Sequence, residues 1–559
     1  MRILIVLLIS ILVLQEAKSQ TLPVGSPIVE GYVRRQQLLG KFDPAISFNY
    51  RPLTFTKNGI STDSLEYISK DLFGYQFNRP GQASTFTILP IEFRVAQDLQ
   101  NPDNRNNGAM IRSRGWQTYL AAGFYAELGP LSIQLKPEFI WAQNKEYIGF
   151  PDWPRHYEST WQVRYNWFNR IDQPERYGDD PYTKVTWGQS SIRLNKWGMS
   201  LGLSTENLWW GPGIRNSIMM SNNAQGFPHI TFNTQRPIIT SIGAFEWQLI
   251  TGRLSDSGYK PPYFEERFRG YEAYVPKVDD SRYYQAITFS YSPKWIQGLS
   301  FGLVRWVQQY IEDTRGFKSH FPAFTNLFKR NVQDEFGFST NQDQAAGFFG
   351  RWVWADANAE VYFEFHKKNA AINLRDLIAN TDHPRALTVG INKLFKMPAS
   401  NAMWQFNFEW TQTSQAQLRL INDASSWYIH NRIRHGYTHN GEVLGSALGP
   451  GGNAQYIEIS WIKGFTRIGG AVERYVHNND FAVAAFNPDF TRYWVDYNLH
   501  GFVELKFDKI LLSSSLFFTK SLNYQWEVLF DPNDPSAFPD TPGVDRINWN
   551  LDIKVSYTL

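Results

Sequence analysis

The segment Ile547-Asn548-Trp549-Asn550-Leu551-Asp552-Ile553-Lys554-Val555-Ser556-Tyr557-Thr558-Leu559 alternates apolar and polar side chains at every position. Because successive side chains of a β-strand point to opposite faces of the sheet, this alternation predicts a strand with one apolar and one polar face. The segment is also longer than the strands of soluble sheets, which have about 5 to 6 residues. It therefore indicates a sheet that separates an apolar environment from a polar one.

The same alternation recurs along the chain, most clearly at residues 493–507, 404–410, 131–136 and 361–366. Repeated segments of this kind with aromatic ends are typical of outer-membrane β-barrels. Lipid admits only helices and closed barrels, because every backbone polar group must be paired internally. A soluble sandwich or propeller is the alternative, but the strands are long for either and no blade-length repeat is visible. We predict an all-β transmembrane antiparallel barrel of about 18 strands.

Composition and the first residues favour a bacterial envelope protein. Of 559 residues, 16% are aromatic, the formal net charge is +3, and none is cysteine. Such a small net charge provides no strong positive electrostatic field to attract nucleic acid. Without cysteine there is no disulfide framework and no cysteine-type metal site. Met1-Arg2, the apolar run 3–14 and Ala17-x-Ser19 predict a secretory signal peptide at 1–19, cleaved after Ser19. Beyond it, no apolar run is long enough for a membrane helix.

The predicted mature chain divides into two parts. Residues 20–80 lack clean alternation and contain a short predicted helix, Pro27 to Leu39, with Gly40 as its end. We interpret 20–80 as an N-terminal periplasmic or plug segment, with a loosely ordered arm as the alternative. Residues 81–559 form the predicted barrel.

Loop lengths predict which connections lie outside the cell. Bacterial barrels have short periplasmic turns and longer outer loops. With the C-terminus on the periplasmic side, counting strands backward places 416–453 and 209–226 on the outer side. A strand at 158–168 would upset this alternation of inner and outer connections, so these residues are assigned to the outer loop 144–182.

The run from Asn207 to His229 is the least ordinary part of the chain. Trp209-Trp210 lead into Gly211-Pro212-Gly213, past which a strand cannot continue, and a loop of this length is usually functional or packed into a cavity. Aromatic faces, amides and arginines are the groups that bind sugars. The loop therefore supplies candidates for glycan binding or for plugging the lumen, namely Trp209, Trp210, Arg215, Asn216, Asn222, Asn223 and His229. The two tryptophans alternatively fit membrane-interface anchors.

The predicted outer loop 416–453 is basic and aromatic, which suits an acidic polysaccharide. Its candidates are Trp427, Tyr428, Arg432 and Arg434, and the alternative is a solvated loop with surface aromatics. We predict no catalytic residue, since there is no cysteine, no His-Glu-x-x-His and no Gly-x-Ser-x-Gly. No metal site or cofactor is predicted either.

These motifs resemble the capsule-assembly Wzi family of outer-membrane proteins, in its Bacteroidetes-type form. The resemblance rests on the run from Asn207 to His229, Thr234-Gln235-Arg236-Pro237, Ile242-Gly243-Ala244-Phe245-Glu246, Asn107-Gly108-Ala109, Arg114-Gly115, Leu135-Lys136-Pro137-Glu138 and Arg34-Arg35-Gln36-Gln37-Leu38-Leu39-Gly40. It implies an 18-stranded barrel with a periplasmic helical element and outer loops folded into the lumen. It also implies a lectin-like, non-catalytic role in holding secreted polysaccharide at the cell surface. One departure is the short N-terminal helix, where the family's well-understood members have a larger helical bundle.

The expected function is therefore attachment or organisation of capsular polysaccharide or exopolysaccharide by an outer-membrane barrel without enzymatic activity. We expect its partners to be this polysaccharide and outer-membrane lipid, and the barrel to be a monomer. The alternative is a porin-like channel for small solutes or sugar oligomers, because a barrel of this size is wide enough for an aqueous channel. An outer-membrane enzyme is the third possibility.

Overall fold

A computed structural model describes residues 20–25, 27–55, 84–103, 105–150, 158–260, 267–268, 270–325, 341–368, 375, 378, 384–398, 400–415, 426–486, 492–527 and 543–559. The predicted signal peptide, 1–19, and residues 56–83 of the predicted N-terminal segment lie outside this set. Among the helices that the structure describes, none is long and apolar enough to cross a membrane.

The described strands form a closed antiparallel barrel of 18 strands, as predicted. Three of the strands are interrupted and carry two labels each, β6 with β7, β8 with β9, and β12 with β13. The barrel closes where β29 pairs with β4, with Asn550 opposite Asp98 and Tyr557 opposite Ile91. The wall strands are β4 (Ser84–Asp98), β5 (Gly115–Leu128), β6 (Leu131–Leu135), β7 (Glu138–Ala142), β8 (Tyr182–Thr186), β9 (Ser191–Lys196), β10 (Met199–Ser204), β12 (His229–Thr234), β13 (Ile238–Ile239), β14 (Gly243–Leu254), β17 (Arg282–Pro293), β18 (Leu299–Tyr310), β19 (Asp343–Trp354), β20 (Ala359–Lys368), β21 (Arg385–Lys396), β22 (Ala402–Gln412), β25 (Asn453–Lys463), β26 (Thr466–Val476), β27 (Val495–Phe507), β28 (Ile510–Leu522) and β29 (Arg546–Tyr557).

The alternation along each strand sorts side chains between lipid and lumen. In β9, Ile192 and Leu194 are 52% and 53% exposed, whereas Arg193 between them is 4% exposed. Large apolar side chains on the outside and polar ones inside are the pattern of a membrane barrel. Near the short turns, exposed Trp197 and Trp295 fit the aromatic belt of a membrane–water interface.

All short connections lie at one end of the barrel and the long ones at the other, as the loop lengths predict. Two strands end earlier than the chain direction alone suggests. Ile238–Ile239 pair with Ala244–Phe245 and end the strand that begins with β12, so β14 begins only at Gly243. The strand β10 ends at Ser204, before Trp209-Trp210.

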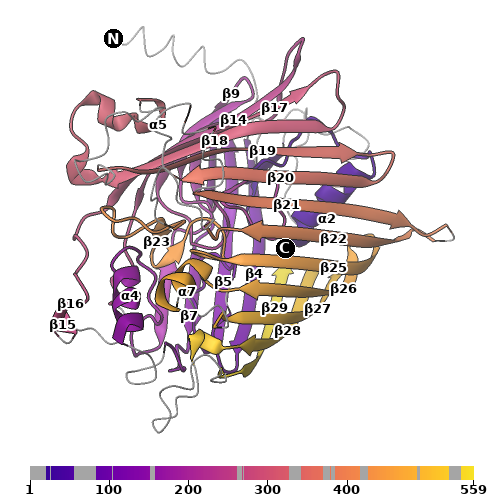
Figure 1. Cartoon of the computed structure of the whole chain (residues 1–559). Helices are drawn as coiled ribbons and strands as arrows, with labels where there is room; N and C mark the ends of the chain where they lie inside the picture. Colours follow the sequence, from indigo (N-terminus) through magenta and orange to yellow (C-terminus); the bar gives the residue numbers. More distant parts are fainter. Residues whose placement is uncertain are drawn as a thin grey trace.

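Segments at the long-loop end form small structures above the wall. Residues 158–168, assigned only to an outer loop from the sequence, fold into the helix α4 (Glu158–Phe168), which packs against α7 (Asn479–Phe486) (Figure 1). Trp161, Tyr165 and Phe481 belong to their shared apolar cluster. The other described elements of this end are β15 (Arg267–Phe268), β16 (Tyr271–Glu272), η1 (Ile311–Asp313), η2 (Phe317–His320), α5 (Pro322–Thr325), β23 (Thr438–His439), β24 (Glu442–Val443) and η3 (Tyr524–Trp526).

The N-terminal segment lies inside the wall at the short-turn end. Its helix α2 runs from Pro27 to Leu38 and is drawn in indigo in Figure 1. Gly40 follows the helix at φ 70°, the left-handed conformation that ends helices and favours glycine. The helix packs its apolar face on inward-facing wall residues, and Tyr32 stacks on Phe465 with ring centroids 4.1 Å apart. Around it, β1 (Gln20–Leu22) pairs with β3 (Leu53–Phe55), and β2 (Tyr50–Arg51) pairs with β11 (Trp209–Trp210).

Candidate functional site

The connection between β10 and β12, residues 205–228, folds down into the lumen. Its two tryptophans pair with the N-terminal segment, Trp209 opposite Arg51 and Trp210 opposite Tyr50. The Trp210 indole nitrogen donates to Oε1 of Gln248 on the inner wall at 2.7 Å. The tryptophans are 5% and 1% exposed, so the reading of these residues as membrane-interface anchors was wrong.

Two carboxylates on the inner wall hold the glycine-rich turn of this loop. Glu409 of β22 accepts hydrogen bonds from three successive backbone N–H groups, those of residues 214, 215 and 216, at 2.8, 3.0 and 2.7 Å. Glu364 of β20 accepts from the N–H groups of Gly213 and Ile218, both at 3.1 Å. A side chain at Gly213 would place its Cβ 1.9 Å from the backbone oxygen of Asn216, so only glycine allows this close turn.

The remaining predicted residues of this loop bind other parts of the protein. The Asn216 side chain accepts from the Ser446 hydroxyl at 3.0 Å, Asn222 accepts from Asn207 at 2.6 Å, and Asn223 donates to the Val443 carbonyl at 2.9 Å. His229 is buried at the start of β12, with Nδ1 2.7 Å from the Phe227 carbonyl. Arg215 pairs with Glu473 of β26 at 3.4 Å. Hydrogen bonding of buried amides to the chain itself is the usual arrangement.

The connection between β22 and β25 contributes a second inserted segment, residues 426–452. Trp427 and Tyr428 are buried, and the Tyr428 hydroxyl donates to the carbonyl of Ile218 in the first loop at 2.8 Å. Arg434 is half-buried and donates to the carbonyls of Asn169 and Pro276. Arg432 is exposed. The alternative of a solvated loop with surface aromatics was therefore wrong, because Trp427 and Tyr428 are buried.

The two inserted segments and the wall share one apolar core in the middle of the barrel. Trp210, Met219 and Phe227 of the first segment, with Tyr437 of the second, belong to it. Tyr437 stacks on the wall residue Trp306 with ring centroids 4.1 Å apart. Burial of aromatic and apolar side chains is the main source of stability for such a core. We call residues 205–228 and 426–452 together the lumen plug.

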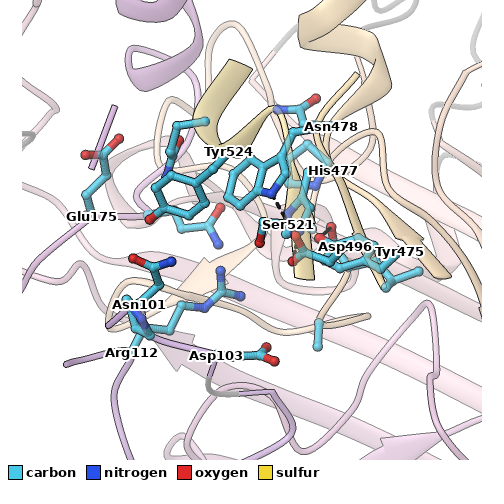
Figure 2. A pocket seen from close by; sticks show the side chains of 18 of the residues that line it. Asn101, Asp103, Arg112, Glu175, Tyr475, His477, Asn478, Asp496, Ser521 and Tyr524 are labelled. Carbon is cyan, nitrogen blue, oxygen red and sulfur yellow. Dashed lines mark hydrogen bonds and ion pairs between the residues drawn. The ribbon is translucent and has the colours of Figure 1, made fainter. Parts of the chain in front are cut away.

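A cavity of about 200 Å³ lies above the plug at the long-loop end. Figure 2 shows its side chains converging from several loops and strand ends. His477, Trp494 and Asp496 come from the hairpin of β26 and β27, and Tyr524 comes from η3. We call this space the outer cavity. None of these four residues was singled out from the sequence.

Asp496 organises one wall of the outer cavity. Its carboxylate lies 2.6 Å from Nε2 of His477 and accepts from the Trp494 indole nitrogen at 2.9 Å. The His477 ring stacks on Trp494 with centroids 3.6 Å apart and an interplanar angle of 8°. Tyr524 meets the same indole edge-on at 5.1 Å. The result is a rigid aromatic surface with a carboxylate beside it.

The facing wall is polar and carries Asn101, Asp103 and Arg112 (Figure 2). Burial alone would lower the pKa of Arg112, but the Glu442 carboxylate 3.2 Å away outweighs it and raises the pKa. Arg105 lies below, bound to Asp103 at 2.9 Å and to Glu473 at 2.8 Å. Opposed donors and acceptors next to aromatic rings can bind a ligand that carries hydroxyls on an otherwise apolar ring. Among the described residues, no group of histidine and carboxylate side chains could hold a metal ion.

One feature of the sequence could have pointed to this cavity. His477-Asn478 and Tyr493-Trp494 stand at the two ends of the connection between β26 and β27, so aromatic and amide groups meet at its base. The contribution of Tyr524 and Asn101 depends on pairings between distant strands, which local patterns do not specify.

Comparison with known proteins decides the family. The family model described as capsule assembly protein Wzi matches residues 100–483, more than half of the chain. The chain belongs to the Wzi family. A solved Wzi structure from Escherichia coli is similar to this Wzi-family barrel with a TM-score of 0.58 and 12% sequence identity, covering 98% of this chain and 100% of that one. That protein is described as a carbohydrate-binding β-barrel involved in group 1 capsule assembly.

Other solved barrels are more distant from this Wzi-family chain. OprD of Pseudomonas aeruginosa matches with a TM-score of 0.37 and 8% identity, covering 88% of this chain and 95% of that one. OccAB2 of Acinetobacter baumannii matches with a TM-score of 0.39 and 10% identity, covering 84% and 97%. A search of curated proteins finds none that matches this chain with significance.

Proposed function

We propose that this Wzi-family protein attaches or organises capsular polysaccharide or exopolysaccharide at the cell surface, without catalysing a reaction. The observation that carries the proposal is the outer cavity, an aromatic and polar recess at the long-loop end of a barrel whose lumen is plugged. The carbohydrate-binding description of the Escherichia coli structure supports the same chemistry.

In this proposal, a sugar ring lies against the aromatic wall while its hydroxyls exchange hydrogen bonds with Asp496, Arg112 and Asn101. The Asp496 carboxylate is held by His477 and Trp494, so its position is fixed before the sugar arrives. A long polymer of repeating units binds many barrels at once, and weak single contacts then add up to firm attachment. The exposed Arg432 extends the contact surface for an acidic polymer.

The plug residues have a different role in the proposal. Trp209, Trp210, Asn216, Asn223 and Tyr428 fix the inserted segments rather than touch the polymer, because their side chains are buried. They support the cavity from below. In this proposal the outside of the barrel wall contacts outer-membrane lipid. The protein is a monomer.

The direct test is titration of the solubilised barrel with oligosaccharides cut from the cell's own surface polysaccharide. Asp496→Asn should weaken binding about tenfold or more, because a charge-assisted hydrogen bond contributes about 1.5–3 kcal/mol and 1.4 kcal/mol is a factor of ten. The matched control is Asp179→Asn, whose carboxylate is exposed in an outer loop. If Asp496→Asn binds the oligosaccharides as tightly as wild type, and its heat-modifiable migration shows a folded barrel, then the outer cavity is not the binding site.

A further inference from the structure

A second cavity, of about 370 Å³, lies inside the barrel below the plug. Helix α2, the underside of the 205–228 loop and the inner faces of β21, β22, β25 to β29 and β4 enclose it. We call it the inner chamber. Asp103 and Arg105 line both cavities, so this pair and its partners separate the two. The volume is in the range of small-molecule sites, about 300–1,000 Å³.

Cations line the inner chamber, and nearly all of them are paired. Those with a carboxylate within ion-pair distance are Arg34, Arg51, Arg94, Arg105, Arg215, Arg467 and Lys554. Arg35 of α2 is the exception. Among the residues that the structure describes, none forms a hydrogen bond or ion pair with its guanidinium.

The isolation of Arg35 is costly unless something binds it. The residue is only 4% exposed, and its Nη2 is buried with no partner in the described part of the chain. Burial and the neighbouring Arg467 lower its pKa to about 10, so it remains a cation at neutral pH. The two nearby carboxylates, Glu458 and Glu504, are both bound by Arg467. A buried charge without hydrogen bonds is strongly unfavourable, so it indicates a missing partner.

Other unpartnered polar atoms gather around the same chamber. Both ring nitrogens of His500 are buried and bind none of the residues that the structure describes, and the ring stacks on Phe517 with centroids 4.0 Å apart. The side-chain oxygens of Gln405 and Asn407 are also buried, and no described residue donates to them. All four residues line the chamber. Such a concentration of unsatisfied donors and acceptors is the expected lining of a site for a polar ligand.

We propose that the inner chamber is a second ligand-binding site, for a sugar-sized molecule that carries a carboxylate. The guanidinium of Arg35 binds the carboxylate, since its planar fork matches two carboxylate oxygens. His500, Gln405 and Asn407 take the hydroxyls. The proposal goes beyond the surface role proposed above, because this site lies on the inner side of the plug and does not require the outer cavity.

The test uses the full-length solubilised barrel and three probes of known chemistry. D-glucuronate combines a sugar ring with a carboxylate, D-glucose lacks the carboxylate, and acetate lacks the sugar. We expect glucuronate to bind measurably by isothermal titration, and glucose and acetate to bind at least tenfold more weakly. Arg35→Met should reduce glucuronate affinity tenfold or more.

Two controls separate this site from other causes. Arg315→Met, in an exposed outer loop, should leave glucuronate binding unchanged. Asp496→Asn weakens any binding of glucuronate in the outer cavity, whereas Asp496 does not line the inner chamber. Glucuronate binding that persists in Asp496→Asn and is lost in Arg35→Met therefore belongs to the inner chamber, so failure of the outer cavity and failure of the inner chamber are distinguishable. Without ligand, Arg35→Met should unfold at the same or a higher denaturant concentration than wild type, because it removes an unpaired buried charge.

Three results would overturn the proposal. Equal affinity for acetate and glucuronate would show a free-oxyanion site with no sugar recognition. Absence of glucuronate binding would show a chamber filled by solvent. A destabilised Arg35→Met barrel that still binds glucuronate with wild-type affinity would make Arg35 a structural residue.

Discussion

At the scale of single residues, side-chain chemistry was easier to predict than side-chain surroundings. The sequence indicated that Trp209 and Asn216 belong to an unusual loop, yet their burial depends on partners far along the chain, such as Arg51 and Ser446. Local spacing carries no information about such distant pairs. For this reason the plug residues could be nominated from the sequence, whereas most of the outer cavity, such as Asn101 and Tyr524, could not.

Two buried histidines of the plug predict a response to acid. Burial lowers the pKa of His435 to about 2 and that of His439 well below its usual value, so both are neutral in the folded plug. When the segment undocks, its histidines regain their ordinary pKa near 6.5 and take up protons below that pH. The free energy of docking is therefore fully favourable above pH 6.5. As the pH decreases below 6.5, docking weakens by up to about 1.4 kcal/mol per pH unit for each histidine. We expect protease cleavage within 426–452 to be faster at pH 5.0 than at pH 7.5.

His435→Gln should reduce this pH dependence, because it removes one of the groups that take up a proton when the segment undocks. His320→Gln, at an exposed position of η2, is the matched control and should behave as wild type. Equal cleavage rates at both pH values in the wild-type protein would contradict the prediction.

At the scale of elements, the strands followed from the sequence and the inserted loops did not. Alternation of side chains is a local property, and it located wall strands such as β27 and β29. The loop 205–228 has no period, and its fold is fixed by the wall carboxylates Glu364 and Glu409. The sequence did not predict helix α4, because its apolar residues form no stripe along one face that would distinguish a helix from a strand or a loop.

Removal of the Glu409 carboxylate should loosen the plug. Glu409→Ala leaves three backbone N–H groups and the Tyr362 hydroxyl without their acceptor, at about 1–3 kcal/mol for each buried group that stays unpaired. In a planar lipid bilayer, wild-type protein should show no steady large openings, whereas the variant should show frequent ones. Glu312→Ala, at an exposed outer position, is the control and should stay closed.

The same recordings decide between the plugged barrel and the porin-like alternative. Steady large openings of the wild-type barrel would favour a channel for solutes or sugar oligomers. A closed Glu409→Ala barrel would show that the other contacts of the plug, including its apolar core, hold it without this carboxylate.

At the scale of the whole molecule, the barrel places two different recesses on opposite sides of one plug. The outer cavity lies at the long-loop end, and the inner chamber lies beside α2 at the short-turn end. The plug lies between the two recesses, and Asp103 and Arg105 line both of them. This division follows from tertiary contacts between the N-terminal segment, the inserted loops and the wall, whereas the sequence indicated only that the run from Asn207 to His229 either plugs the lumen or binds a glycan.

The most direct test of surface attachment is the distribution of polysaccharide between cells and medium. Cells that lack the gene should make the same total amount of polysaccharide but release most of it into the medium. Wild-type protein should restore retention, whereas Asp496→Asn, produced at the same level in the outer membrane, should restore it poorly. Normal retention in cells that lack the gene would contradict the central claim that this Wzi-family barrel holds polysaccharide at the cell surface.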